Sequence, residues 1–388
     1  MLTTGYIITE KDEFVNSFFD IFKIVYILSA KSFVDITVPI LYNIITGDDN
    51  MKKIICLVTA LLLCLSLTAC SDKNTPEEST DSITEQTTKE TEKEKQTEEK
   101  NTTEDKESKV TPLLYKITDT DGDVIWLFGS IHVGREDFYP LPDYVTDAFD
   151  SSEGLAVELN IVEFEKNMKE QINALAPLVF ADGTTISDHI TEESYENAVE
   201  ILDENGVYLT LYDRYRPVMW SNLIDNIIIS RSDAEVDLGI DRHLIEMAGN
   251  ADKEILDIES AKAQYSMLAS FSPELQQLML DSSIEAYYSD TAEQELEELV
   301  DLWAMGDAEG LCEYLDESDE FDEGMEELYT EYETAMVLER NLLMTEFAAN
   351  ALEEGEELFI CVGAAHVVGD DGIAALLEKQ GCTVEIIK

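Results

Sequence analysis

Two histidines follow glycines in matching short motifs near opposite ends of the chain. The first motif is Gly129-Ser130-Ile131-His132, and the second is Gly363-Ala364-Ala365-His366. Each comes directly after an apolar run typical of a buried strand, residues 124–128 and 358–362. Open α/β sheets build their sites at the carboxyl ends of such strands. The pattern therefore predicts that two imidazoles meet at one edge of a sheet.

Acidic residues end two further predicted strands. Glu158 closes an apolar run that begins at Gly154, and Glu259 closes a run that begins at Glu254. A carboxylate at the end of a buried run needs a partner or a shifted pKa, so both are candidate site residues. The alternative for Glu158 is an exposed strand terminus.

His132, Glu158 and His366 together form a ligand set that suits a divalent transition metal with an open coordination position. Such a metal (Mn, Co or Zn) lowers the pKa of its bound water and polarises a carbonyl group, which is hydrolytic chemistry. The alternative without a metal uses His132 or His366 as a general base.

Arg340 is predicted to support these groups from a helix of about residues 332–352. Helical spacing places it on one face with four apolar residues: Met336, Leu343, Phe347 and Ala351. A buried arginine needs an acceptor, and a strand-end carboxylate would keep it ionised and oriented. The alternative is an arginine that extends along the surface to solvent. Arg340 and Glu259 are therefore candidate supporting residues.

The remaining pattern of residues 111–388 predicts one large α/β domain, with a central sheet, flanking helices and a helical insertion. A strand at residues 113–118 is followed by Asp119-Thr120-Asp121-Gly122-Asp123, which favours a hairpin turn over a calcium loop. The chain ends in a strand–helix–strand pattern. Helical periodicity is found in segments 144–149, 192–204 and 218–229 and in the acidic stretch 270–335, and another helix is expected to start at Gly239.

The charge of the chain limits its partners. The net charge is −59, from 84 acidic and 25 basic residues, and residues 111–388 alone carry −51. A nucleic-acid binder needs a basic surface, so this class is excluded, and adhesion to anionic lipid by charge is disfavoured. Six cysteines are too few for a disulfide scaffold at this length. Cys361 is expected inside a strand, and a bond to Cys382 is possible.

Residues 51–70 resemble a bacterial lipoprotein signal. Met51-Lys52-Lys53 precedes an apolar run that ends in Leu67-Thr68-Ala69-Cys70, which makes Cys70 the expected lipidated residue. Residues 1–50 are then an upstream extension that is not part of the translated protein, and residues 71–110 are a disordered, Thr-rich and acidic tether. The expected location is the extracytoplasmic face of the cell membrane. The alternative is an uncleaved N-terminal anchor.

These residues resemble the TraB/GumN family, which includes the pheromone-shutdown proteins and is related to the Tiki proteases. The paired G-x-x-H motifs and Glu158 carry the resemblance, which extends over essentially all of residues 111–388. Three more features match: Gly239-Ile240-Asp241, the pair Glu259 and Gln264, and Arg340-Asn341. The resemblance implies a fold similar to the erythromycin-esterase/ChaN group and metal-dependent peptide cleavage by His132, His366 and Glu158.

The sequence thus predicts a surface lipoprotein that hydrolyses an extracellular peptide or protein with a divalent metal. The rival is a lipoprotein of the same fold that binds a peptide, such as a pheromone, without cutting it. A purely structural role for the lipoprotein would not explain why the chain contains two matched histidine motifs. The other two histidines, His189 and His243, lie on polar segments away from predicted strand ends.

Overall fold

Six strands form one mixed sheet in the computed structural model, which describes residues 108–315 and 325–388. The order across the sheet is β4-β3-β5-β2-β1-β6. The first four strands in this order are parallel, and β1 is antiparallel to both of its neighbours. The strands are β1 (Leu114–Thr118), β2 (Val124–Ser130), β3 (Gly154–Val157), β4 (Glu254–Asp257), β5 (Leu358–Gly363) and β6 (Thr383–Ile387).

The central strands β2 and β5 are apolar along their length because helices cover both faces of a parallel sheet. Phe128 of β2 stands opposite Cys361 of β5, and the rings of Phe128 and Phe359 lie 5.6 Å apart. In the predicted hairpin between β1 and β2, the side chain of Asp119 accepts hydrogen bonds from three consecutive backbone N–H groups, those of residues 121–123. The predicted central sheet is therefore confirmed.

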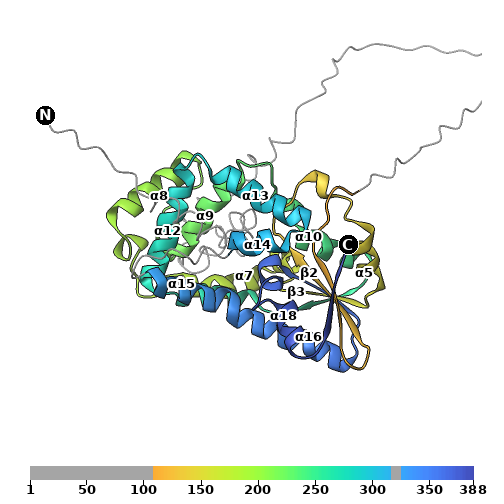
Figure 1. Ribbon diagram of the computed structural model, residues 1–388. Coiled ribbons are helices and arrows are strands. Elements are labelled where there is room, and N and C mark those ends of the chain that lie inside the picture. Colours follow the sequence, from red (N-terminus) through yellow and green to blue (C-terminus); the bar gives the residue numbers. More distant parts are fainter. Residues whose placement is uncertain (1–107, 316–324) are drawn as a thin grey trace, which may run out of the picture. The chain divides into compact units, whose positions relative to one another are not determined.

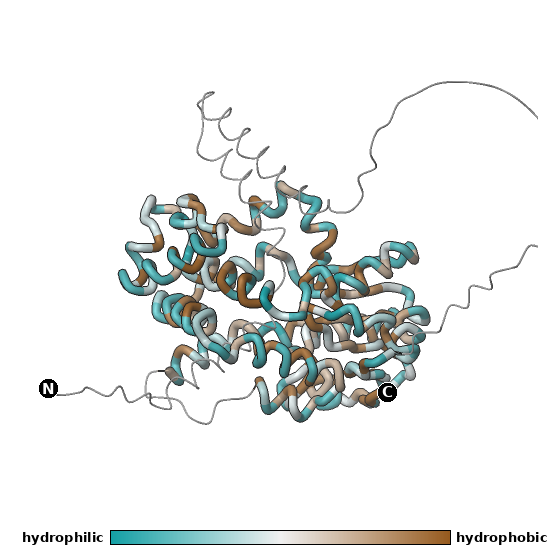
Figure 2. The backbone as a smooth tube through the Cα atoms, turned by 90° about the horizontal axis from the view of Figure 1, so that it is seen from above, coloured by the Kyte–Doolittle hydropathy of each residue, from teal (hydrophilic) through white to brown (hydrophobic). Residues whose placement is uncertain are grey.

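Helices surround the sheet and form a second layer beyond it (Figure 1). α10 packs on β3 and β4, α16 on β2, and α18 on β1 and β6. Alternating teal and brown segments along the helices in Figure 2 mark their amphipathic faces. The helices are α5 (Asp143–Ser151), α6 (Ile161–Lys166), α7 (Met168–Leu175), α8 (Glu192–Glu204), α9 (Pro217–Ile229), α10 (Ile240–Asn250), α11 (Ala261–Ser270), α12 (Pro273–Tyr288), α13 (Ala292–Met305), α14 (Ala308–Leu315), α15 (Met325–Glu333), α16 (Glu339–Glu354), α17 (Ala364–Val367) and α18 (Ile373–Lys379).

The predicted helical insertion is present as a series of helices rather than one long one. α12, α13, α14 and α15 occupy its described part, and α12 packs against α9. None of the described helices is long and apolar enough to span a bilayer. The predicted lipoprotein signal with Cys70, the upstream extension and nearly all of the tether lie outside the described residues.

The predicted helix over residues 332–352 is interrupted at its start. α15 ends at Glu333, a π-helical turn covers Thr334–Leu338, and α16 follows. A π turn holds more residues than an α turn, so it rotates the apolar face relative to a continuous α-helix. The predicted placement of Leu343 on the buried face is wrong, since this residue of α16 is 47% exposed. Arg340 is buried as predicted, together with Met344, Ala348 and Ala351.

Candidate functional site

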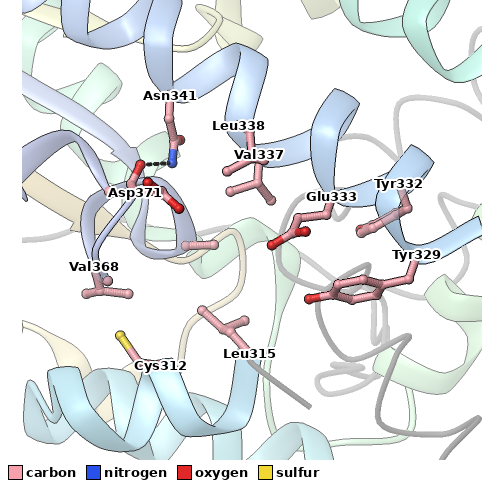
Figure 3. Close-up of a pocket in the computed structure, with 13 residues that line it drawn as sticks. Cys312, Leu315, Tyr329, Tyr332, Glu333, Val337, Leu338, Asn341, Val368 and Asp371 are labelled. Carbon is pink, nitrogen blue, oxygen red and sulfur yellow. Dashed lines mark hydrogen bonds between the residues drawn. The ribbon is translucent and has the colours of Figure 1, made fainter. Parts of the chain in front are cut away.

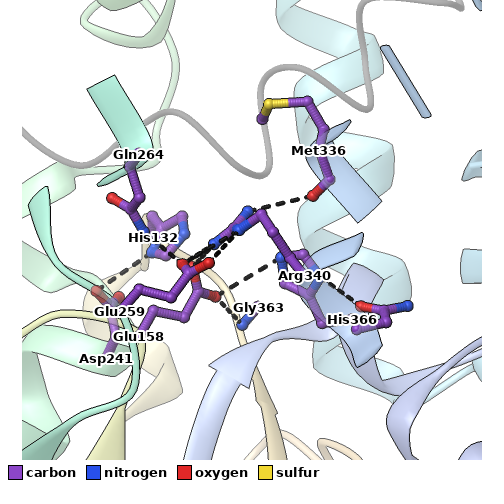
Figure 4. Close-up of polar contacts among 10 residues, drawn as sticks. His132, Glu158, Asp241, Glu259, Gln264, Met336, Arg340, Gly363 and His366 are labelled. Carbon is purple, nitrogen blue, oxygen red and sulfur yellow. Dashed lines mark hydrogen bonds and ion pairs between the residues drawn. The ribbon is translucent and has the colours of Figure 1, made fainter. Parts of the chain in front are cut away.

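Four of the sequence-predicted residues lie at the carboxyl ends of four adjacent parallel strands. Glu259, Glu158, His366 and His132 follow β4, β3, β5 and β2, which is also the order of these strands in the sheet. Figure 4 shows their side chains pointing toward one another and toward Arg340, which comes from α16. The structure therefore brings all five candidate residues into one cluster at this edge of the sheet.

Arg340 connects the two carboxylates of the cluster. Its side chain is 6% exposed, and its Nη2 donates to Glu158 Oε2 at 2.5 Å and to Glu259 Oε2 at 2.7 Å. Its Nε donates to Glu259 Oε1 at 2.9 Å, and its Nη1 donates to the Met336 carbonyl in the π turn at 3.3 Å. Burial alone lowers the pKa of Arg340, but the two carboxylates outweigh burial and raise it. The guanidinium is therefore a fixed positive charge.

Glu158 is a buried carboxylate with several partners. Its Oε1 accepts from the backbone N–H of Gly363 at 2.7 Å and lies 4.0 Å from His366 Nε2. Burial favours the neutral acid, yet Arg340, the two histidines and the Gly363 N–H lower the pKa of Glu158 to about 2. Glu158 is therefore ionised at neutral pH.

Asn341, a residue of α16 that contacts His366, sets the tautomer of this histidine. The Asn341 Nδ2 donates to the Asp371 carbonyl at 2.8 Å, so its Oδ1 is the atom that lies 2.7 Å from His366 Nδ1. His366 Nδ1 therefore carries the proton, and Nε2 keeps its lone pair. Burial and then Arg340 lower the pKa of His366 to about 3, which keeps the imidazole neutral.

His132 has a charged partner instead. Its Nδ1 lies 3.2 Å from Oδ2 of Asp241, the second residue of α10. Burial lowers the pKa of His132, but Asp241 and then Glu158 more than compensate, so the pKa is raised. The Nε2 atoms of His132 and His366 are both buried and have no hydrogen-bond partner among the described residues.

The His132 loop is fixed against the segment that leads into α10. Gly134 and Glu235 exchange backbone hydrogen bonds of 2.9 and 2.8 Å, and the Ile240 N–H donates to the Ile131 carbonyl at 2.9 Å. A Cβ at Gly239 would lie 2.6 Å from the His132 carbonyl oxygen, so only glycine permits this approach. The close contact explains how Asp241 comes to face His132.

Gly239→Ala should therefore separate the two segments and destabilise the fold by about 1–3 kcal/mol, the usual cost of overpacking. Gly249→Ala, in the helix α10 that Gly239 precedes, is the control because a Cβ there meets nothing within 4 Å. The control should raise stability by up to about 1 kcal/mol, since alanine has the higher helix propensity. Urea unfolding measures both variants. Equal midpoints would contradict the role of Gly239.

Sequence reasoning missed two residues of the cluster as individual site residues, Asp241 and Asn341. Each appeared only within a motif shared with the TraB/GumN family, because nothing in the local pattern shows which histidine a helix residue will contact. Gln264, known from the same resemblance, donates to Glu259 Oε2 at 2.9 Å.

The other histidines and the cysteines lie outside the cluster. His189 stacks on Phe180 with ring centroids 4.0 Å apart, and His243 packs on Tyr139 at 4.4 Å. Among the described residues, Cys312, Cys361 and Cys382 form no disulfide bond, so the possible Cys361–Cys382 bond is absent. Burial raises the pKa of the Cys361 thiol well above its usual value, so this residue is an unreactive part of the core.

The donor set fits a divalent metal in chemistry, although the described residues contain no group of three or more His, Cys, Asp or Glu side chains arranged to hold one. Two buried imidazole Nε2 atoms have no hydrogen-bond partner within the described ranges, and one of them, that of His366, lies 4.0 Å from Glu158 Oε1. Their Nδ1 atoms face an amide and a carboxylate, which is the usual support of metal-binding histidines. Arg340 competes for the other carboxylate oxygen, Oε2.

Comparison with known proteins identifies the family of the chain. A model of the TraB/PrgY/gumN family matches residues 113–386. The chain belongs to this family. Proteins named "Uncharacterized protein YbaP" from Escherichia coli K12 and Shigella flexneri are each 23% identical to it over 177 residues. The match covers 46% of this chain and 62% of each relative, so the chain spans less than two thirds of their length.

No solved structure matches the chain. The assignment to the mixed α/β class therefore rests on the observed sheet and its flanking helices. The similarity to the erythromycin-esterase/ChaN group stays a prediction.

Proposed function

We propose that this TraB/PrgY/gumN family protein is a metal-dependent hydrolase that cleaves peptides. The observation that carries the proposal is the pair of buried Nε2 atoms on His132 and His366, which have no hydrogen-bond partner in the described part of the chain and lie beside an ionised Glu158. These three residues would hold the metal. A bound Mn²⁺, Co²⁺ or Zn²⁺ supplies a water of lowered pKa and polarises the peptide carbonyl.

The chain's own residues prepare this site in three ways. Asn341 holds the proton on Nδ1 of His366, so its Nε2 keeps a lone pair, and Asp241 faces Nδ1 of His132, so Nε2 is the nitrogen of that ring left for a metal. Arg340 and the Gly363 N–H keep Glu158 ionised. Glu259 and Gln264 hold Arg340 in place from the neighbouring strand end and α11.

The proposed substrate is an extracellular peptide or protein, because the N-terminal sequence is typical of an exported lipoprotein with Cys70 as its lipidated residue. The lipid would hold the protein on the extracytoplasmic face of the membrane. The tether 71–110 would then give the domain reach from the membrane surface.

A second candidate function is peptide binding without cleavage. The observation that favours it is the ion pair between Arg340 and Glu158, which already occupies Oε2 of the carboxylate. A site whose charges are satisfied within the protein has less need of a metal ion. In this case the strand ends would bind the peptide and leave it intact.

The two functions are separated by metal content and product analysis. The full chain is purified, its bound metals are measured, and a mixed peptide pool is incubated with it after addition of Mn²⁺, Co²⁺ or Zn²⁺. If the protein is a hydrolase, we expect about one metal ion per chain and new peptide termini detected by mass spectrometry. Peptide binding with neither metal nor cleavage would establish the second function and exclude the first.

A further inference from the structure

A cavity of about 200 Å³ lies beside His366, between the α15–α16 segment and the loop that follows α17 (Figure 3). Asn341 and Ala365 both line it. Asn341 is hydrogen-bonded to His366, and Ala365 precedes His366 in the chain. The cavity therefore shares a wall with the candidate active site.

The size of the cavity suits a single side chain. Ligand pockets for whole small molecules measure roughly 300–1,000 Å³, whereas a cavity of about 150 Å³ holds a benzene ring. A volume of about 200 Å³ is thus large enough for one long side chain and too small for a folded peptide segment.

The lining combines an apolar wall with negative charge. Tyr329, Val337 and Leu338 come from the α15–α16 segment, and Figure 3 shows the Glu333 carboxylate among them, pointing into the cavity. Asp371 lies on the opposite side. Of the 13 described residues that line the cavity, 8 are apolar or aromatic, 2 are acidic and none is basic.

This combination matches a cation at the end of an apolar stem. Lysine and arginine pack their methylene groups against apolar surfaces and place the charged group on a carboxylate or an aromatic ring. An acidic side chain would meet two like charges, a neutral one would gain nothing from them, and a basic one would meet two opposite charges. Charge complementarity therefore selects a basic side chain.

We propose that the cavity is the subsite for one lysine or arginine side chain of the peptide substrate, with Glu333 as its specificity-determining residue. The proposal rests on the peptidase function proposed above. It adds a substrate preference that the histidine cluster alone does not supply, because that cluster would act only on the peptide group to be cleaved.

The test compares three blocked peptides that differ at one position, which is lysine, norleucine or glutamate. Norleucine is the matched neutral analogue of lysine. The full chain with Mn²⁺, Co²⁺ or Zn²⁺ should cleave the lysine peptide about tenfold more efficiently than the norleucine peptide, the size expected for one charge-assisted contact. Glu333→Gln should remove this preference. Glu327→Gln, an exposed acidic residue of α15, should keep it.

The same peptides are also measured by fluorescence anisotropy, which does not depend on catalysis. A lysine preference in binding that Glu333→Gln removes would support the subsite even if no peptide is cut, and only the hydrolase function would then fail. Cleavage with equal rates for lysine and norleucine would overturn the subsite and leave the hydrolase intact. Failure to bind or cleave any of the peptides would overturn both.

Discussion

His132→Ala and His366→Ala are each expected to abolish metal binding and peptide cleavage together. Each replacement removes one of the two buried imidazole Nε2 atoms for which residues 108–315 and 325–388 provide no hydrogen-bond partner. A catalytic metal contributes several kcal/mol to the transition state, and each 1.36 kcal/mol is a factor of ten, so cleavage should fall about a thousandfold or more. Metal content by mass spectrometry and cleavage rates measure the two effects.

The chain contains its own controls for this prediction, because it has four histidines. His189→Ala and His243→Ala remove imidazoles that pack on aromatic rings away from the cluster, so both variants should keep their metal and their activity. His132→Gln and His366→Gln serve as conservative replacements if alanine prevents folding, which circular dichroism reports. Full activity in a folded variant at His132 or His366 would remove that residue from the site.

The strand ends could be predicted from the sequence because a parallel buried strand has a recognisable local pattern. An apolar run with branched and aromatic residues fixes the strand, and the residue after it must lie at the edge where open sheets form their sites. The positions of His132, Glu158, Glu259 and His366 follow from this rule. The rule depends only on residues next to each other in the chain, which is why it succeeded.

The contacts that orient these side chains could not be predicted in the same way. Asp241 reaches His132 because Gly239 allows close approach of two segments about a hundred residues apart. Asn341 reaches His366 because α16 packs with Arg340, Asn341 and Met344 buried, and this packing leaves Leu343 exposed. Both cases depend on how elements pack, and no periodicity within one element encodes that.

Arg340→Met is expected to destabilise the protein by about 3–5 kcal/mol at neutral pH, the cost of leaving buried charge without its partner. Methionine has a similar length and fills the space, but Glu158 and Glu259 lose the guanidinium that binds both of them. Urea unfolding at pH 7 measures the loss. Arg242→Met is the control, since Arg242 pairs with Glu165 at partly exposed positions and should cost about 1 kcal/mol.

The pH dependence of this loss follows from the pKa of Glu158. In the wild-type protein that pKa is lowered from 4.5 to about 2, so the stabilisation is present above pH 4.5 and is lost as the pH falls toward 2. Without Arg340, Glu158 loses the largest of the causes that lower its pKa, so this pKa rises and much of the stabilisation is missing from the variant. Because the wild-type protein loses the same stabilisation as the pH falls, the difference between the two proteins should shrink on acidification.

A further variant separates the charge effect from simple loss of packing. Combining Arg340→Met with Glu158→Gln and Glu259→Gln removes the buried charges together with their partner, and neutral replacement of a whole buried ion pair is often tolerated. The triple variant should therefore recover part of the stability lost by Arg340→Met and lose its unusual pH dependence. If it is no more stable than the single variant at pH 7, the carboxylates are not what makes Arg340 necessary. The strand-end cluster would then owe its stability to packing around α16 rather than to charge.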